Sequence, residues 1–139
     1  MESGKEMKNQ RMLDELTELM RIDVSSGQET EIAEHLVKKL EQMGFAITRD
    51  EAGATFGGVC GNILAVREGE RDGVVCFCSH MDRVPGGIGI KPVEEDGILR
   101  SSGDTILAAD DLSGVAAILE GVRLSLIHIS EPTRQAEIS

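Results

Sequence analysis

Two short clusters of acidic and histidine side chains in this sequence could support chemistry. The first, Ser79–Asp82, follows an apolar run, and the second, Asp110-Asp111, precedes a predicted helix. In extended backbone, side chains two positions apart point to one face, so Asp82 can hydrogen-bond His80. Such a carboxylate fixes the tautomer of a histidine that binds a metal. A core histidine beside a turn aspartate has the same spacing, so this pair alone leaves metal binding open.

The aspartate pair also allows two interpretations. An aspartate near the start of a helix commonly accepts hydrogen bonds from free backbone N–H groups and interacts favourably with the helix dipole. A carboxylate can also bridge two divalent cations about 3.5–4 Å apart. Taken alone, Asp110-Asp111 is more typical of a helix cap. Together with His80 and Asp82, it becomes a candidate for metal binding.

The elements that must position these clusters alternate between helices and strands. Apolar residues at helical spacing predict a helix over Met12–Met20 and a second over Ile32–Met43, with Ser26 and Glu29 at capping-box spacing. Gly44 occupies the position of a helix C-terminal glycine. The predicted strands and the last helix follow in this order: Phe45–Thr48, Asn62–Val66, Val74–Ser79, a hairpin of Ile90–Val93 with Ile98–Ser101, and a helix over Leu112–Arg123.

The run Val74–Ser79 is apolar on both faces, which predicts a strand in the middle of a covered sheet. Cys76 and Cys78 on that strand are then expected as buried core thiols. His80 would follow its carboxyl end, where ligands of α/β sheets gather. The predicted fold class is therefore α/β, in one domain.

Composition excludes several classes of function. The 139 residues carry 14 Lys and Arg against 25 Asp and Glu, a net charge of −11, so we expect no nucleic-acid partner and no membrane surface. The longest apolar runs have five residues, far short of the ~20 of a membrane span. The charged N-terminus does not look like a secretory signal, and the three cysteines are an odd number. These features predict a cytoplasmic protein.

The two clusters and their surroundings resemble the M20 family of zinc-dependent exopeptidases, in particular its peptidase T-like members, which are tripeptide aminopeptidase-like. The resemblance extends from about Arg11 to Arg123. It rests on four stretches: Asp23–Glu29 (DVSSGQE), Val74–Pro85 (VVCFCSHMDRVP), Gly89–Ser101 (GIKPVEEDGILRS) and Thr105–Glu120 (TILAADDLSGVAAILE).

The resemblance implies the N-terminal part of a zinc-exopeptidase catalytic domain, with a mixed sheet flanked by helices. It implies two zinc ions per complete site. His80 would be a ligand of one zinc, Asp110 would bridge both, and Asp82, the implied catalytic-site residue, would orient His80. The peptide bond between Asp110 and Asp111 would be cis, and Asp111 has no metal role carried over. The implied substrate is a small peptide, and the implied assembly of the complete protein is a homodimer.

The sequence also departs from this family. The adjacent glutamate pair that supplies the general base, and the remaining zinc ligands, lie downstream in the family and have no counterpart here. Glu94-Glu95 precedes Asp110 in a predicted turn, so we interpret it as solvated. Arg83 and Leu112 stand where threonine and lysine are frequent. The 139-residue chain is therefore expected to be inactive. An M20 amidohydrolase acting on an N-acyl or N-carbamoyl amino acid, or a non-catalytic peptide- or metal-binding relative, stays an alternative.

The last sixteen residues do not continue the preceding pattern. Leu124–Ser139 reads LSLIHISEPTRQAEIS and resembles the translation of a transposase-type sequencing-library adapter. We therefore expect residues 1–123 to be the N-terminal segment of an M20-type catalytic domain and residues 124–139 to be an adapter-derived tail. His128 then carries no functional weight, and the natural protein is expected to continue beyond Arg123.

Overall fold

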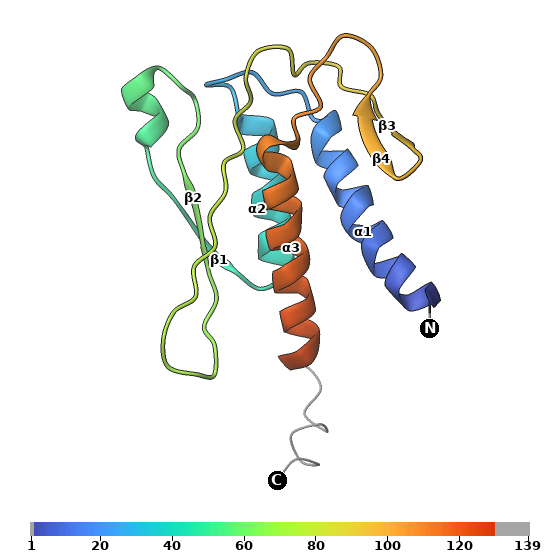
Figure 1. The fold of residues 1–139 in the computed structure, drawn as a ribbon. Coiled ribbons are helices and arrows are strands. Elements are labelled where there is room, and N and C mark those ends of the chain that lie inside the picture. Colours follow the sequence, from blue (N-terminus) through green and yellow to red (C-terminus); the bar gives the residue numbers. More distant parts are fainter. Residues whose placement is uncertain (1, 130–139) are drawn as a thin grey trace.

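The computed structural model describes the backbone of residues 2–129 and the side chains of residues 9–127. The fold is α/β, as predicted, with the helical segments making most of the core. Figure 1 shows the β1–β2 pair on the α2 side of the helices and the β3–β4 hairpin beside α1. In chain order the elements are α1 (Glu2–Arg21), α2 (Thr30–Gln42), β1 (Ala46–Arg49), the 3-10 helix η1 (Ala52–Phe56), β2 (Ile63–Val66), β3 (Pro92–Glu95), β4 (Ile98–Ser101) and α3 (Ala109–Ile129).

The core is assembled from the apolar faces of the three helices. Helix α1 contributes Leu19 and Met20, which have no exposed surface, in agreement with the predicted apolar stripe. Helix α2 contributes Ile32 and Leu36. Helix α3 contributes Leu112, Val115 and Leu119, whose spacing places them on one face of the helix. The members of the core cluster are Leu19, Met20, Val24, Ile32, Leu36, Ile90, Ala108, Leu112, Val115 and Leu119.

Helix α2 begins later than the capping-box spacing predicts. Its N-cap is Glu29, whose side chain makes no capping hydrogen bond. The Glu29 carboxylate instead accepts a hydrogen bond from the Gly27 N–H at 2.5 Å, so it closes the preceding turn. The capping-box prediction for Ser26 is therefore wrong. Gly44 has the positive φ of +86° expected after a helix, which confirms its predicted role.

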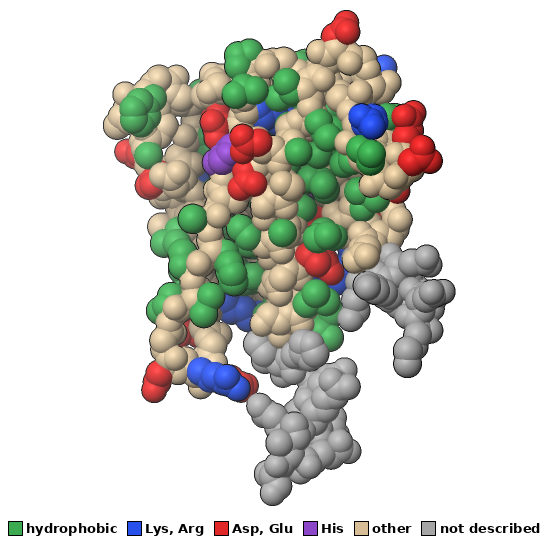
Figure 2. All heavy atoms as spheres, viewed as in Figure 1, with side chains coloured by type: hydrophobic (Ala, Val, Ile, Leu, Met, Phe, Trp, Pro, Cys, Tyr) green, Lys and Arg blue, Asp and Glu red, His purple; other side chains and the backbone are tan. Residues whose placement is uncertain are grey.

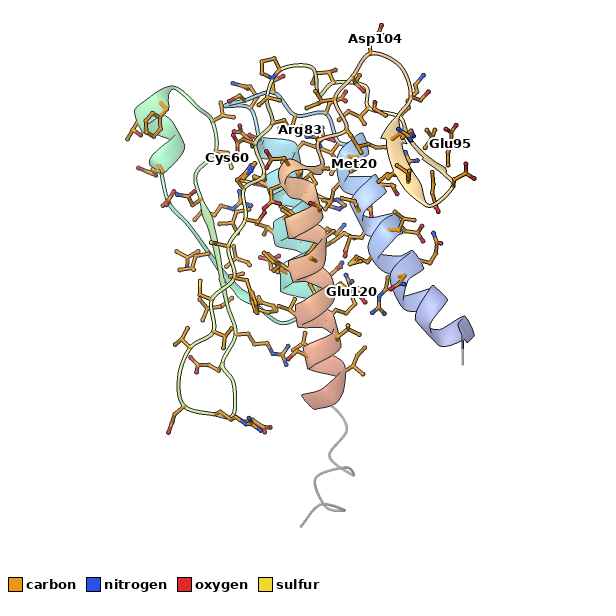
Figure 3. The ribbon with its side chains drawn as sticks, viewed as in Figure 1. Met20, Cys60, Arg83, Glu95, Asp104 and Glu120 are labelled. Atoms are coloured by element: carbon orange, nitrogen blue, oxygen red, sulfur yellow. The ribbon has the colours of Figure 1, made fainter. Side chains whose placement is uncertain are left out.

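An ion-pair network joins the three helices. Glu15 of α1, only 4% exposed, accepts hydrogen bonds from Arg123 of α3 and Lys39 of α2. Glu120 of α3, labelled in Figure 3 between α1 and α3, accepts from Arg11 of α1. Because each buried carboxylate faces cations from other helices, the network fixes how α1 lies against α2 and α3.

The predicted central strand Val74–Ser79 is wrong. The segment is extended but lies outside every strand of the described residues, and Val74, Val75 and Phe77 are 93%, 80% and 65% exposed. Cys76 and Cys78 are exposed too, so their predicted burial is also wrong. Figure 2 shows hydrophobic side chains on the surface where this segment and β2 lie. An apolar run becomes a strand only where neighbouring strands accept its hydrogen bonds, and the described residues offer none here.

The strands form two separate antiparallel pairs instead of the mixed sheet that the resemblance implies. Strand β1 pairs with β2 from Ala46 opposite Val66 to Arg49 opposite Ile63. Strands β3 and β4 form the predicted hairpin, but β3 runs from Pro92 to Glu95, two residues later than the predicted strand Ile90–Val93. Its turn residues Asp96 and Gly97 both have positive φ, as a two-residue type I′ turn requires. Without a paired central strand, nothing connects the two pairs into one sheet among residues 2–129.

Helix α3 is longer than predicted and begins with an irregular turn. It extends six residues past the predicted end at Arg123, to Ile129, and no glycine or proline interrupts that stretch. At its start, Asp110 and Asp111 have non-helical backbone angles, and regular helix follows them. None of the described helices is both long and apolar enough to cross a bilayer.

Candidate metal-ligand site

His80 lies between two carboxylates. Its Nδ1 is 2.9 Å from Asp82 Oδ1, and its Nε2 is 3.0 Å from Asp110 Oδ1. The structure therefore brings together all three residues singled out from the sequence. The Asp82 contact follows from the spacing of two positions, whereas the Asp110 contact joins the exposed segment after Val74 to the start of α3.

The three side chains are open to solvent. His80 is 50% exposed, Asp82 is 56% exposed and Asp110 is 96% exposed. The hydrogen bond with Asp110 raises the pKa of His80 above its ordinary value, and the charge of Asp82 acts in the same direction. A protonated imidazole is thus stabilised here by the two carboxylates that flank it.

The donor atoms suit a zinc ion but are too few to form a complete site. An imidazole nitrogen and a carboxylate oxygen are both common zinc ligands, and Asp82 at Nδ1 is the usual second partner of a metal-bound histidine. No group of three or more His, Cys, Asp or Glu side chains within the described part of the chain could hold a metal ion. His80 and Asp110 are therefore chemically suitable as metal ligands but do not by themselves complete a site among the described residues.

The backbone around Asp110 has an unusual course. Ala108 has a φ of +63°, and the peptide bond between Asp110 and Asp111 is cis. The cis bond confirms what the resemblance implies for this position. Asp110 points away from the core, whereas the next residue turns inward and is half-buried.

Asp111 accepts two hydrogen bonds from different parts of the chain. Its Oδ2 accepts from Ser79 Oγ at 2.5 Å, and its Oδ1 accepts from the Gly114 N–H at 3.2 Å. The second bond confirms that Asp111 caps the helix start, one of the two interpretations made from the sequence. The Ser79 contact was not predicted, because a serine beside a histidine carries no signal of its partner.

Arg83 fixes the loop that follows Asp82. The residue is 3% exposed, and its guanidinium donates hydrogen bonds to the carbonyl oxygens of Leu19 at 2.8 Å and Gly87 at 2.9 Å. The loop is held a second time where the Gly89 N–H donates to Asp23 Oδ1 at 2.8 Å. Figure 3 shows Arg83 close to Met20, at the C-terminal end of α1. Arg83 thus ties the loop at Gly87 to the carbonyl oxygens of Leu19 and Met20 in the last turn of α1.

The glutamate pair of the β3–β4 hairpin plays no part in this site. Glu94 and Glu95 lie on strand β3, so their predicted place in the turn is wrong. Both are exposed, as the predicted solvated role requires.

Comparison with known proteins finds relatives among peptidases. No protein-family model matches the chain. The chain is 39% identical to the aminopeptidase PepT of Bacillus cereus, with a TM-score of 0.78 over 82% of its length. It is also 33% identical to a tripeptidase of Staphylococcus aureus, and this match covers 88% of the present chain with a TM-score of 0.79. The uncharacterized protein YqjE of Bacillus subtilis is 36% identical over 115 residues, 82% of this chain.

The chain spans about a third of the length of each of these relatives. It covers 31% of YqjE, 31% of the PepT chain and 33% of the tripeptidase chain. The α/β fold of the chain thus corresponds to a partial region of PepT-type tripeptidase and aminopeptidase domains. These solved neighbours are peptidases, so the chain is related to hydrolases in sequence as well as in fold.

Proposed function

We propose that the chain is the N-terminal part of the catalytic domain of an M20-type, dizinc exopeptidase that removes an N-terminal residue from short peptides. The observation that carries the proposal is the position of His80 between Asp82 and Asp110. The likeness to an aminopeptidase and a tripeptidase supports the choice of peptide substrates over acylated amino acids.

Each of the three residues has a separate role in the proposed site. Asp82 holds the Nδ1 proton of His80, which leaves Nε2 as the atom that binds metal. Asp110 supplies a solvent-facing carboxylate, the type of ligand that can bridge two cations. Zinc held by His80 and Asp110 would supply a bound water of lowered pKa and a Lewis acid for the peptide carbonyl.

The 139-residue chain by itself is proposed to be inactive. It offers two metal donors, and the adjacent glutamate pair that supplies the general base in the M20 family has no counterpart in its sequence. We propose that residues 1–123 belong to the natural domain and that residues 124–139 derive from a sequencing adapter. The complete protein is proposed to be cytoplasmic and homodimeric, without nucleic-acid or membrane partners.

The test begins with the gene. Resequencing the source DNA across the codon for Arg123 should reveal a reading frame that continues into an adjacent glutamate pair, a further acidic ligand and a late histidine. A genome that encodes Leu124–Ser139 and then a stop codon would contradict the proposal. It would favour a short non-catalytic relative.

The protein expressed from the continued frame should bind about two zinc ions per chain, as a dinuclear site requires. It should release the first residue of a tripeptide and leave the N-acetylated tripeptide intact. His80→Ala and Asp110→Ala should abolish both zinc binding and activity, and Asp82→Asn should weaken zinc binding about 10–100-fold. Glu95→Gln, an exposed acidic control, should change neither. Cleavage of an N-acyl amino acid instead of the tripeptide would support the amidohydrolase alternative.

A further inference from the structure

We propose that Ser79 and Asp111 form a link, independent of metal, that holds His80 against Asp110. The role of this link in metal binding rests on the function proposed above. The link itself uses neither of the candidate metal-binding atoms, so it can be tested without any metal.

The link connects the two segments that carry the candidate ligands. Ser79 immediately precedes His80, and Asp111 immediately follows Asp110. Ser79 Oγ lies 2.5 Å from Asp111 Oδ2 and 3.2 Å from the Asp111 carbonyl oxygen, so one hydroxyl faces two acceptors of one residue. A hydroxyl to carboxylate hydrogen bond of this length is among the stronger ones in proteins.

The other end of the link is anchored on α3. Asp111 Oδ1 accepts the Gly114 N–H, so the carboxylate cannot turn away from Ser79 without leaving a helix N–H free. Gly114 makes this position possible, because a Cβ atom there would lie 2.5 Å from both carboxylate oxygens of Asp111. By contrast, a Cβ at Gly121 of the same helix would meet no atom within 4 Å.

The link matters because the direct contact of the two ligands cannot hold them once a metal binds. The direct contact uses His80 Nε2 and Asp110 Oδ1, which are the atoms that would then bind the ion. The Ser79–Asp111 hydrogen bond uses neither atom and therefore persists. The segment around Ser79 is exposed and unpaired, so it has few other contacts that restrict its position. Ligands held in place before binding lose less conformational entropy when the metal binds.

The first test is spectroscopic and uses the metal-free 139-residue chain, at a dilution where light scattering shows a monomer. The side-chain ¹⁵N shifts of His80 report the hydrogen bonds at both ring nitrogens, and they are recorded at one alkaline pH. Ser79→Ala and Gly114→Ala should move the Nε2 signal toward that of a solvated imidazole. Ser79→Thr, which keeps the hydroxyl, should restore the wild-type signal, and Gly121→Ala should leave it unchanged.

The second test measures the Zn²⁺ affinity of the protein expressed from the continued reading frame, with Zn²⁺ alone, by competition with a chromogenic chelator. Ser79→Ala and Gly114→Ala should weaken Zn²⁺ binding about 10-fold, the lower limit for outer-shell partners of metal ligands. Ser79→Thr and Gly121→Ala should bind like wild type. Thermal melts of all four variants identify any loss that comes from unfolding.

The possible results separate the link from the proposed function. Unchanged His80 signals in Ser79→Ala and Gly114→Ala, with melts like wild type, would overturn the link. A His80 Nε2 signal that shifts in Ser79→Ala but has its wild-type position in Ser79→Thr would support the link. Absence of Zn²⁺ binding in the wild-type chain and in the protein from the continued reading frame would refute the metal function. The spectroscopic result would still decide whether the link exists.

Discussion

Replacing Glu15 with glutamine should destabilise the fold by about 2 kcal/mol. Glu15 is 4% exposed and accepts hydrogen bonds from Lys39 at 3.1 Å and from Arg123 at 2.9 and 3.1 Å. Glutamine has nearly the same size, but its amide nitrogen would face these donors. The substitution therefore removes a charge and at least one charge-assisted hydrogen bond without creating a cavity.

The magnitude follows from the partners that the two cations keep. Breaking a buried ion pair costs about 3–5 kcal/mol where it leaves a charge unpaired. Here Arg123 retains Glu120 at 2.9 Å, and Lys39 retains Glu18 at 3.3 Å. Neither cation is left alone, so the loss should fall below that range. It should exceed the ~0–1 kcal/mol of an exposed pair, because Glu15 lies inside the helix interface.

Urea denaturation followed by far-ultraviolet circular dichroism measures this loss as a shift of the midpoint at constant slope. Glu18→Gln is the matched control, because Glu18 faces the same Lys39 from the same helix but is 52% exposed. It should cost at most about 0.5 kcal/mol. Equal losses for the two variants would refute the reasoning that burial makes Glu15 the stronger contact.

Three further predictions concern acid, the core and the exposed apolar segment. Burial raises the pKa of Glu15, but the hydrogen bonds from Arg123 and Lys39 outweigh burial, so its pKa lies below the ordinary value. The hydrogen bond from Arg11 likewise lowers the pKa of Glu120. Carboxylates with depressed folded-state pKa values stabilise the fold above their unfolded values, so urea midpoints should fall below about pH 5, less steeply in Glu15→Gln. Leu119→Ala, at a site 2% exposed, should lower the free energy of unfolding by about 2–5 kcal/mol; a loss below about 1 kcal/mol would show that this part of the core is loosely packed. Val75→Lys should reduce light scattering at high protein concentration without moving the urea midpoint, because Val75 is 80% exposed; unchanged scattering would place self-association elsewhere.

The features that could be predicted from the sequence are those that depend on neighbours in the chain. The helical stripe ending at Met20 and the β3–β4 turn at Asp96-Gly97 need only local periodicity and local backbone preferences. The contact of His80 with Asp82 likewise follows from a spacing of two residues. The strand predicted for Val74–Ser79 is absent, because a strand needs neighbouring strands that an apolar pattern does not reveal.

The candidate ligand residues could be named from the sequence, but the side chains that hold them in position could not. The meeting of His80 with Asp110 was implied by a family resemblance and not by periodicity, since 30 positions separate them. Arg83 bonds a carbonyl 64 positions earlier, and Ser79 bonds a carboxylate 32 positions later. Neither side chain carries a local signal of such a partner, so only the folded arrangement identifies these two residues as supports.

The packing of α1 against α3 has a consequence for the order in which the chain is buried during synthesis. Arg11 of α1 finds Glu120 only 109 residues later. At about 5–20 residues per second, α1 leaves the ribosome and waits about 5–20 s before its partner helix has been made. During that interval Leu19 and Met20 lack the α3 side of their core. Helix α1 is thus made before α3 but is covered only after α3 has been made. Mutations that weaken α3 should therefore leave α1 of the nascent chain exposed for longer to proteases and chaperones.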